Sequence, residues 1–118
     1  MAKYLLLLGG ADLDKRSGNI AGPILARYFS WMRDVEAKGH LVGSHKLHDK
    51  TGARLSVRGG QVVEAPFIES KEAIGGLFVI EAASLTEATN IARSCPVLDL
   101  QNGTVEIRPI EEVGRPAT

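Results

Sequence analysis

Two side chains that can exchange a proton near neutral pH stand in the middle of the sequence. His45 lies within a stretch that is typical of a strand, and the reference pKa of an imidazole is close to 7. Glu64 closes a second predicted strand shortly before Pro66. General acid–base chemistry uses such groups within reach of a cleft, so we predict His45 and Glu64 as the catalytic residues. A structural or exposed histidine is the alternative for His45.

Charged side chains near the C-terminus could hold an anionic ligand. The stretch 104–110 alternates, so that Val105 and Ile107 point one way while Glu106 and Arg108 point the other. If the apolar pair meets the helices, Glu106 and Arg108 lie on the opposite face of the sheet and become predicted substrate-binding residues. The alternative is an edge strand whose charges are solvated.

The segment 64–76 is the densest in residues of functional type. Phe67 follows a proline directly, Lys71 belongs to a charged loop, and Gly75-Gly76 allows close backbone approach before an apolar strand. We therefore predict that Phe67 and Lys71 contact the substrate, with Lys71 or Arg108 holding an anionic group. The alternative is a connecting turn that carries ordinary surface charges.

Other reactive residue types do not form a recognisable site. His45 and His48 are three residues apart, which on a strand places them on opposite faces, so we predict no metal site. His40 follows a helix-ending glycine and is expected at the surface. Ser44 has no nucleophile motif around it, and Cys95 is expected to be a packing residue. The glycines make no phosphate-binding pattern, and no cofactor is predicted.

Composition limits the possible partners. The chain has 118 residues, with 14 basic residues balancing 14 acidic ones, which argues against a nucleic-acid partner. A single cysteine is the usage expected in a reducing cytoplasm. The apolar run after Lys3 is too short for a signal peptide, and no stretch is long enough to cross a membrane. We predict one cytoplasmic domain over residues 1–113 and a loose tail over 114–118.

Periodicity predicts the elements that must position these residues. Only 5% of the residues are aromatic, which predicts an aliphatic core. Apolar residues at three- and four-residue steps indicate helices, continuous apolar or alternating runs indicate strands, and Gly59-Gly60 marks a hairpin turn. The inner face of the first helix is predicted at Ile24, Leu25, Tyr28, Trp31, Met32 and Val35. The second helix is predicted to begin with a capping box at Ser84-Leu85-Thr86-Glu87 and to turn Leu85, Ala88, Ile91 and Ala92 inward. The order is strand, helix, strand, hairpin, strand, helix, strand, which predicts an α+β, ferredoxin-like βαββαβ fold with an inserted β-hairpin. The predicted segments are strands 4–8, 41–47, 54–58, 61–65, 77–80 and 104–110, and helices 22–38 and 84–94.

Two central strands predict a homodimer. Tyr4–Leu8 and Leu77–Ile80 are apolar at every position, so both faces of the sheet carry large apolar side chains. With both helices on one face, the other face would expose more apolar surface than a monomer usually tolerates. Packing of two chains through this face would bury it. A loop or the hairpin folding over the face is the alternative.

Several motifs together resemble the YCII-related family. They are Lys3-Tyr4 with its apolar run, Glu64-Ala65-Pro66-Phe67, Glu69-x-Lys71-Glu72-x-x-Gly75-Gly76, and Glu106-Ile107-Arg108-Pro109. The chain is most similar to the branch named for an Asp-Gly-Pro-Phe motif, although Glu64-Ala65 replaces Asp-Gly. The resemblance implies a dimeric α+β barrel with a cleft near the Pro-Phe turn. Glutamate keeps the acid but lengthens its reach, and alanine disfavours positive φ.

Two main functions are consistent with these observations. The first is a small-molecule binder, or a lyase- or isomerase-type enzyme, that takes a small anionic ligand in a cleft beside the dimer sheet. The alternative is a non-catalytic regulatory domain, linked to transcription because some members of the branch occur with sigma factors. An oxygenase of the related dimeric-barrel type rests on fold analogy alone. The sequence does not decide whether the protein is an enzyme.

Overall fold

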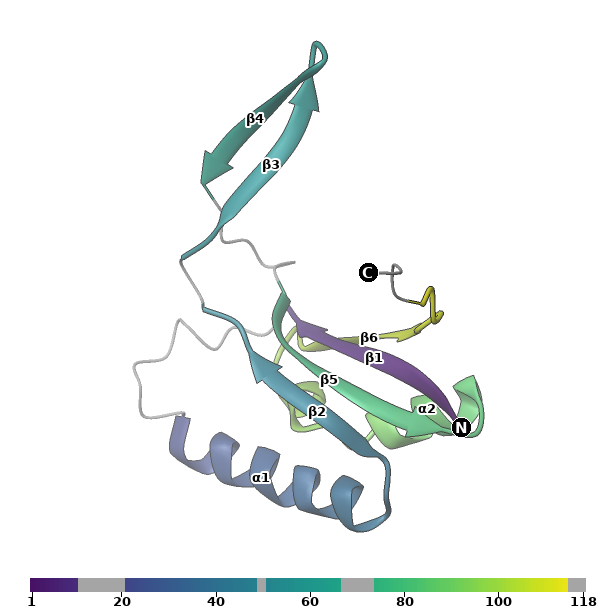
Figure 1. Cartoon of the computed structure of the whole chain (residues 1–118). Helices are drawn as coiled ribbons and strands as arrows, with labels where there is room; N and C mark the ends of the chain where they lie inside the picture. The colour runs from purple at the N-terminus through teal and green to yellow at the C-terminus, as the bar shows by residue number, and fades with distance from the viewer. Residues whose placement is uncertain (11–20, 49–50, 67–73, 115–118) are drawn as a thin grey trace.

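The computed structural model describes residues 1–10, 21–48, 51–66 and 74–114, and of residues 21–23 the backbone alone. Its helices and strands follow the predicted order, with bounds that differ by a few residues (Figure 1). The elements are β1 (Ala2–Gly9), α1 (Ala21–Ala37), β2 (Leu41–Lys46), β3 (Ala53–Arg58), β4 (Gln61–Pro66), β5 (Ile74–Ala82), α2 (Leu85–Ala92), the 3-10 helix η3 (Pro96–Asp99) and β6 (Thr104–Pro109).

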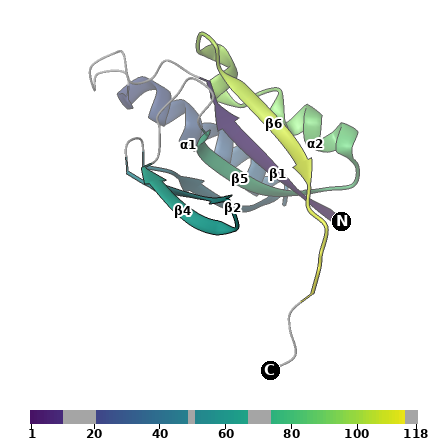
Figure 2. The same cartoon turned by 90° about the horizontal axis from the view of Figure 1, so that it is seen from above.

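Four strands form the main sheet, in the order β2-β5-β1-β6, and all neighbours are antiparallel. Both helices lie on one side of this sheet (Figure 2). With the hairpin set aside, this is the strand order of a ferredoxin-like βαββαβ fold, in which each helix connects two strands that are not neighbours. The predicted fold class is therefore confirmed.

The core lies between the helices and the sheet. Alternate residues of β1 and β5 point into it, and Leu6 and Ile80 are fully buried there. Trp31 of α1 packs its ring edge-to-face against Phe78, with ring centroids 4.9 Å apart. The other buried side chains are Tyr4, Leu8, Val35, Ala82, Ala88, Ala92, Cys95 and Val97. Aliphatic residues thus make up most of the core, as the low aromatic content predicts.

Helix α1 ends where the sequence predicts, at a glycine in the left-handed region. Gly39 has φ +78° and donates its N–H to the Glu36 carbonyl, while His40 donates to the Val35 carbonyl. These two bonds form a Schellman motif, which satisfies the last carbonyls of the helix. The predicted inner face of α1 is correct except at Leu25, which is 50% exposed because the face that meets the sheet is narrower than the apolar stripe.

Helix α2 begins with the predicted capping box. The Ser84 hydroxyl accepts a hydrogen bond from the Glu87 N–H, and the Glu87 carboxylate accepts one from the Ala83 N–H. The prediction that Leu85 faces inward is wrong, since it is 49% exposed at the first turn. The 3-10 helix after Cys95 is also absent from the predictions, because four residues carry too little periodicity to reveal it.

Strands β3 and β4 form a separate two-stranded sheet that projects beyond the end of the main sheet (Figure 1). Gly59 and Gly60 join them with φ values of +57° and +79°, the type of turn that a two-residue hairpin loop requires. Every residue of the hairpin is exposed. No helix in the described ranges is long and apolar enough to cross a membrane.

Candidate functional site

The face of the main sheet away from the helices carries three of the predicted site residues. In an antiparallel sheet, directly paired residues on neighbouring strands point to the same face. His45 pairs with Leu77, Leu77 with Leu7, and Leu7 with Glu106, so one row crosses all four strands. The next row contains Gly43, Val79, Leu5 and Arg108. We call this surface the open face.

The two rows place an apolar floor between polar ends. Leu5, Leu7, Leu77 and Val79 occupy the middle of the open face and are partly exposed. His45 stands at one edge of the sheet, and Glu106 and Arg108 stand at the other. Three strand spacings separate the two edges, which is about 14 Å between backbones. A single small atom cannot contact both ends, whereas a ring-sized molecule lying on the floor can.

The predicted orientation of the last strand is confirmed. Val105 and Ile107 pack against the core, and Glu106 and Arg108 lie on the opposite face. The Arg108 Nη1 donates to the Glu106 Oε2 at 3.2 Å, and both side chains are well exposed. An ion pair this exposed contributes little to stability. The guanidinium has five N–H groups, so it keeps donors available for an anionic ligand.

His45 lies on the edge strand β2 with its imidazole exposed. Its Nε2 lies close to Gly43, since a Cβ placed at that glycine would stand 3.9 Å from it. The neighbouring strand approaches closely on the other side, because a Cβ at Gly76 would meet the His45 carbonyl oxygen at 3.2 Å. The predicted close approach at the glycine pair therefore holds for Gly76.

Glu64 lies on the hairpin and not on the open face. It pairs with Leu55 in the β3–β4 ladder, and its side chain is exposed. The hairpin projects beyond the main sheet (Figure 1), so one chain does not bring Glu64 together with His45. Phe67 and Lys71, the remaining predicted contacts, lie outside the described residues.

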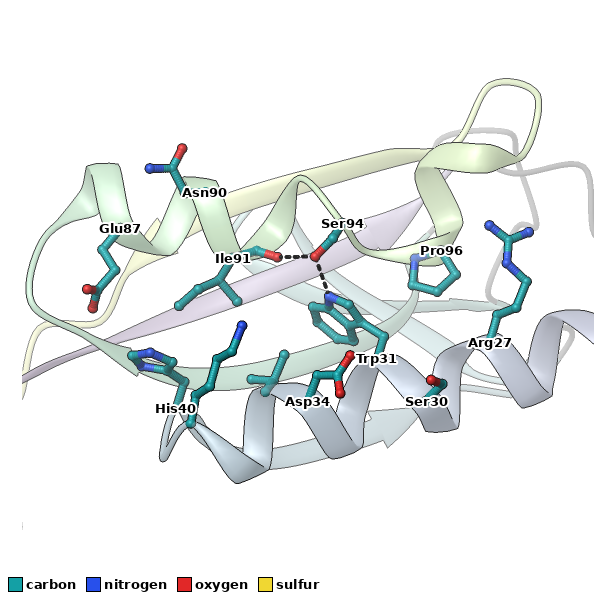
Figure 3. Close-up of a pocket in the computed structure, with 12 residues that line it drawn as sticks. Arg27, Ser30, Trp31, Asp34, His40, Glu87, Asn90, Ile91, Ser94 and Pro96 are labelled. Carbon is teal, nitrogen blue, oxygen red and sulfur yellow. Dashed lines mark hydrogen bonds between the residues drawn. The ribbon is translucent and has the colours of Figure 1, made fainter.

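A groove between α1 and α2 lies on the other side of the sheet (Figure 3), with a volume of about 570 Å³. None of the predicted site residues lines it. Its floor contains Trp31, whose Nε1 donates to the Ser94 hydroxyl at 2.9 Å, and Ser94 donates in turn to the Ile91 carbonyl. Both signs of charge line the walls, from Arg27, Asp34, Lys38 and Glu87.

His40 lines one end of this groove and is only partly exposed, contrary to the expectation of a free surface residue. Its Nδ1 lies 2.8 Å from the Glu81 carbonyl oxygen, which can only accept, so Nδ1 carries a proton. In the neutral ring Nε2 is then an acceptor. Periodicity could not reveal this contact because it joins residues 41 positions apart, which only the fold places together.

Two buried acidic groups are protected from ionisation and are unsuited to nucleophilic chemistry. Burial raises the pKa of the Cys95 thiol to about 11, although a hydrogen bond from the backbone at Val97 opposes the shift. Burial also raises the pKa of Tyr28, with a smaller contribution from the charge of Cys95 and an opposing one from Arg27. Cys95 is thus the packing residue that the sequence predicts. Within the described ranges no group of His, Cys, Asp and Glu could hold a metal ion.

Comparison with known proteins places this geometry in a family. The profile of the YCII-related domain matches residues 7–114. An uncharacterized protein, R00369, from Rhizobium meliloti (strain 1021) is 39% identical over 49 residues, which cover 42% of this chain and 40% of that protein. The matched region thus spans less than half of that relative. The structure is similar to the 5-chloro-2-hydroxyhydroquinone dehydrochlorinase TftG from Burkholderia phenoliruptrix AC1100, solved in complex with 2,5-dihydroxybenzoquinone.

The similarity to TftG has a TM-score of 0.54 at 12% sequence identity and covers 92% of this chain and 93% of the other. At that identity it shows a shared fold and no more. The family profile covers nearly the whole chain, from the end of β1 through β2, β5 and β6, the four strands that carry the open face. The chain belongs to the YCII-related family.

Proposed function

We propose that the protein binds a small anionic molecule on the open face of its sheet and acts on it as a lyase- or isomerase-type enzyme. The observation that carries this proposal is the row that runs from His45 through Leu77 and Leu7 to Glu106, with Arg108 in the next row. It combines an apolar floor with a group able to move a proton and a cation able to hold an anion.

The chemistry assigned to these residues is simple proton transfer. A neutral His45 imidazole takes a proton from the ligand, and the proton moves to a ring nitrogen. The negative charge left on the ligand needs a donor, and Arg108 offers N–H groups that its bond to Glu106 leaves over. The span of about 14 Å between the two ends fits a ring with an anionic substituent. The quinone bound by TftG has this general shape, which makes it a suitable first probe.

An open face by itself does not exclude water, and we propose that a second copy of the chain covers it. Leu5, Leu7, Leu77 and Val79 offer the apolar contact surface, and the polar residues at the two edges would then border a cleft. A layer of strands from the second copy, about 10 Å above the sheet, leaves space for a flat ligand at such a border. Light scattering tests this step, and a monodisperse monomer would contradict it.

Ligand binding is tested by thermal shift with 2,5-dihydroxybenzoquinone and a panel of aromatic carboxylates and phenolates. A ligand that binds the folded state raises Tm, and at 100 times its Kd it adds about 2.7 kcal/mol of stability. The rise should be lost in His45→Ala and Arg108→Ala. Matched controls are His48→Ala and Arg93→Ala, which remove the same groups from exposed positions elsewhere.

Two outcomes would reject the open face as the site. In the first, every variant keeps the full Tm rise, so that none of the named residues is needed. In the second, the rise survives His45→Ala but is lost in His40→Ala, which would place the ligand in the groove between α1 and α2. A substrate found by such a screen would then be followed by a kinetic assay of the same variants, in which loss of kcat in His45→Ala would identify the base.

A further inference from the structure

One face of the β3–β4 hairpin is apolar. The ladder pairs Leu55 with Glu64 and Val57 with Val62, and paired residues share a face. Ala53 and Pro66 lie at the base of the same face. Glu64 is the only charged residue among these six, which are Ala53, Leu55, Val57, Val62, Glu64 and Pro66.

The opposite face of the hairpin is polar. It carries Arg54, Ser56 and Arg58 on β3 and Gln61 on β4, with Val63 and Ala65 as its apolar members. The hairpin is thus amphipathic, as a strand pair is when one side rests on another body. Among the described residues nothing covers the apolar side, since Leu55 is 66% exposed, Val57 72% and Val62 70%. A lone two-stranded hairpin is marginally stable in water, so a covering surface is expected.

The position of the hairpin indicates which surface covers it. It lies on the side of the main sheet away from α1 and α2, the side of the open face, and it projects past the end of its own sheet (Figures 1 and 2). Within the described part of the chain the hairpin therefore does not cover the open face of its own sheet, whereas a second copy packed on that side lies within its reach. The six-residue strands make the hairpin about 20 Å long, enough to extend over a neighbouring sheet.

We propose that the hairpin is an exchanged arm whose apolar face packs on the open face of a second copy of this chain, where it places Glu64 beside the basic residues of the partner's site. This inference rests on the proposed function and extends it, because both chains then contribute residues to one site. Leu55, Val57 and Val62 contact the part of the apolar floor that the ligand leaves free, and Glu64 lies beside His45 at its edge.

The size of the surfaces is consistent with such an exchange. The three exposed arm side chains offer on the order of 100 Å² of apolar surface each. A stable interface buries about 800 Å² per partner. In a dimer with two-fold symmetry each copy buries the apolar face of its own arm and also the open face that receives the partner's arm. The area buried per copy therefore includes both the arm side chains and the rows around Leu7 and Leu77.

Charge provides the second argument. Covering the arm would take the Glu64 carboxylate out of water, which is costly unless a cation meets it. On the open face Lys3 pairs in register with Glu81, and Arg108 bonds Glu106. His45 has Gly43 beside it on its own strand and Leu77 opposite it, and neither is charged. A carboxylate on the partner's arm can accept a hydrogen bond from the ring N–H of this imidazole.

The arm is tested by cross-linking in mixtures of two variants that each carry one added cysteine besides the native Cys95, one of them tagged. Val62→Cys in one copy and Leu77→Cys in the other should form a disulfide-linked dimer under mild oxidation, with Leu5→Cys as a second receiving position. Ser56→Cys lies on the polar face of the hairpin and is the matched control, which should not link. The native Cys95 is buried, so the unmutated protein should stay free of cross-links.

A second measurement reads the assembly without a cross-link. The paired substitution Val57→Asp with Val62→Asp should lower the mass in light scattering to that of a single 12.6 kDa chain, whereas Ser56→Asp should leave the dimer intact. Both changes fall on exposed positions, so circular dichroism should show an unchanged fold for each.

Three results would overturn the arm. In the first, the unmutated protein is a monomer. In the second, Val62→Cys links only to itself. In the third, Ser56→Cys links to Leu77→Cys as efficiently as Val62→Cys does. None of these measurements uses a ligand, so they are separate from the test of function. A cross-linked dimer that binds no ligand would support the exchanged arm and reject the proposed function. A monomer that binds a ligand through His45 would reject the exchanged arm and support ligand binding on the open face.

Discussion

The buried thiol of Cys95 should make the protein lose stability at alkaline pH. The side chain is 1% exposed, and burial raises its pKa from 9.0 to about 11. Between these two values the unfolded chain has released the proton and the folded chain still holds it. The unfolded state then binds fewer protons, so the free energy of unfolding falls as pH rises from about 9 to 11. The contribution of the thiol is complete below pH 9.

The size of the loss follows from the pKa difference. Two pH units at about 1.36 kcal/mol each give a limit of about 3 kcal/mol. At pH 10.5 the folded thiol is still mostly protonated, and the expected loss is about 2 kcal/mol. Tyr28, whose pKa is also raised, mainly by burial and in smaller part by the charge of Cys95, adds a further loss above pH 10.

Urea unfolding of the unmutated protein and of Cys95→Ala, each at pH 7.5 and pH 10.5 and at equal protein concentration, isolates the thiol. Lysine ionisation and the part of the Tyr28 shift that burial causes affect both proteins and cancel in the comparison, while the part that Cys95 causes adds to the difference in the same direction. The unmutated protein should lose about 2 kcal/mol more than the variant between the two pH values. Equal losses would refute the reasoning. A thiol reagent at pH 8 should likewise react slowly with the native protein and quickly in denaturant.

Three further changes test the fold. Leu6→Ala empties a fully buried site and should cost about 2–5 kcal/mol in urea unfolding, and a loss under 1 kcal/mol would mean that the core is looser than described. Ser84→Ala removes the helix cap and should cost about 1 kcal/mol, reversed in part by Ser84→Asp, which can also cap. Gly103→Ala should cost about 3 kcal/mol or more because its Cβ would overlap the Val97 carbonyl, while Gly75→Ala, which meets nothing within 4 Å, should be tolerated.

Much of the fold could be predicted because local chemistry marks its elements. The capping box at Ser84, the glycine after α1 and the Gly59-Gly60 turn each fix an element boundary through hydrogen bonds between near neighbours. Alternation on the last strand likewise placed Glu106 on the correct face. These signals need no knowledge of which elements meet, so a single sequence carries them.

Contacts between distant segments could not be predicted in the same way. The groove depends on how far α1 lies from α2, and the bond from His40 to Glu81 exists only because β2 and β5 are neighbours. Leu25 shows a related limit. Periodicity predicts which side of a helix is apolar, but it does not predict how much of that side the sheet covers. The amphipathic pattern of the hairpin could be read from the sequence, whereas the direction in which it projects could not.

The hairpin leaves and rejoins the sheet at almost the same point. The Leu47 N–H donates to the Gly75 carbonyl oxygen at 3.0 Å, just beyond the last paired residues, Lys46 and Gly76. The segment between these contacts can therefore be exchanged for a short turn without moving a strand of the main sheet. During evolution the hairpin could therefore be gained, lost or altered by insertion and deletion. Relatives with the same sheet could then differ in how, and with whom, they assemble.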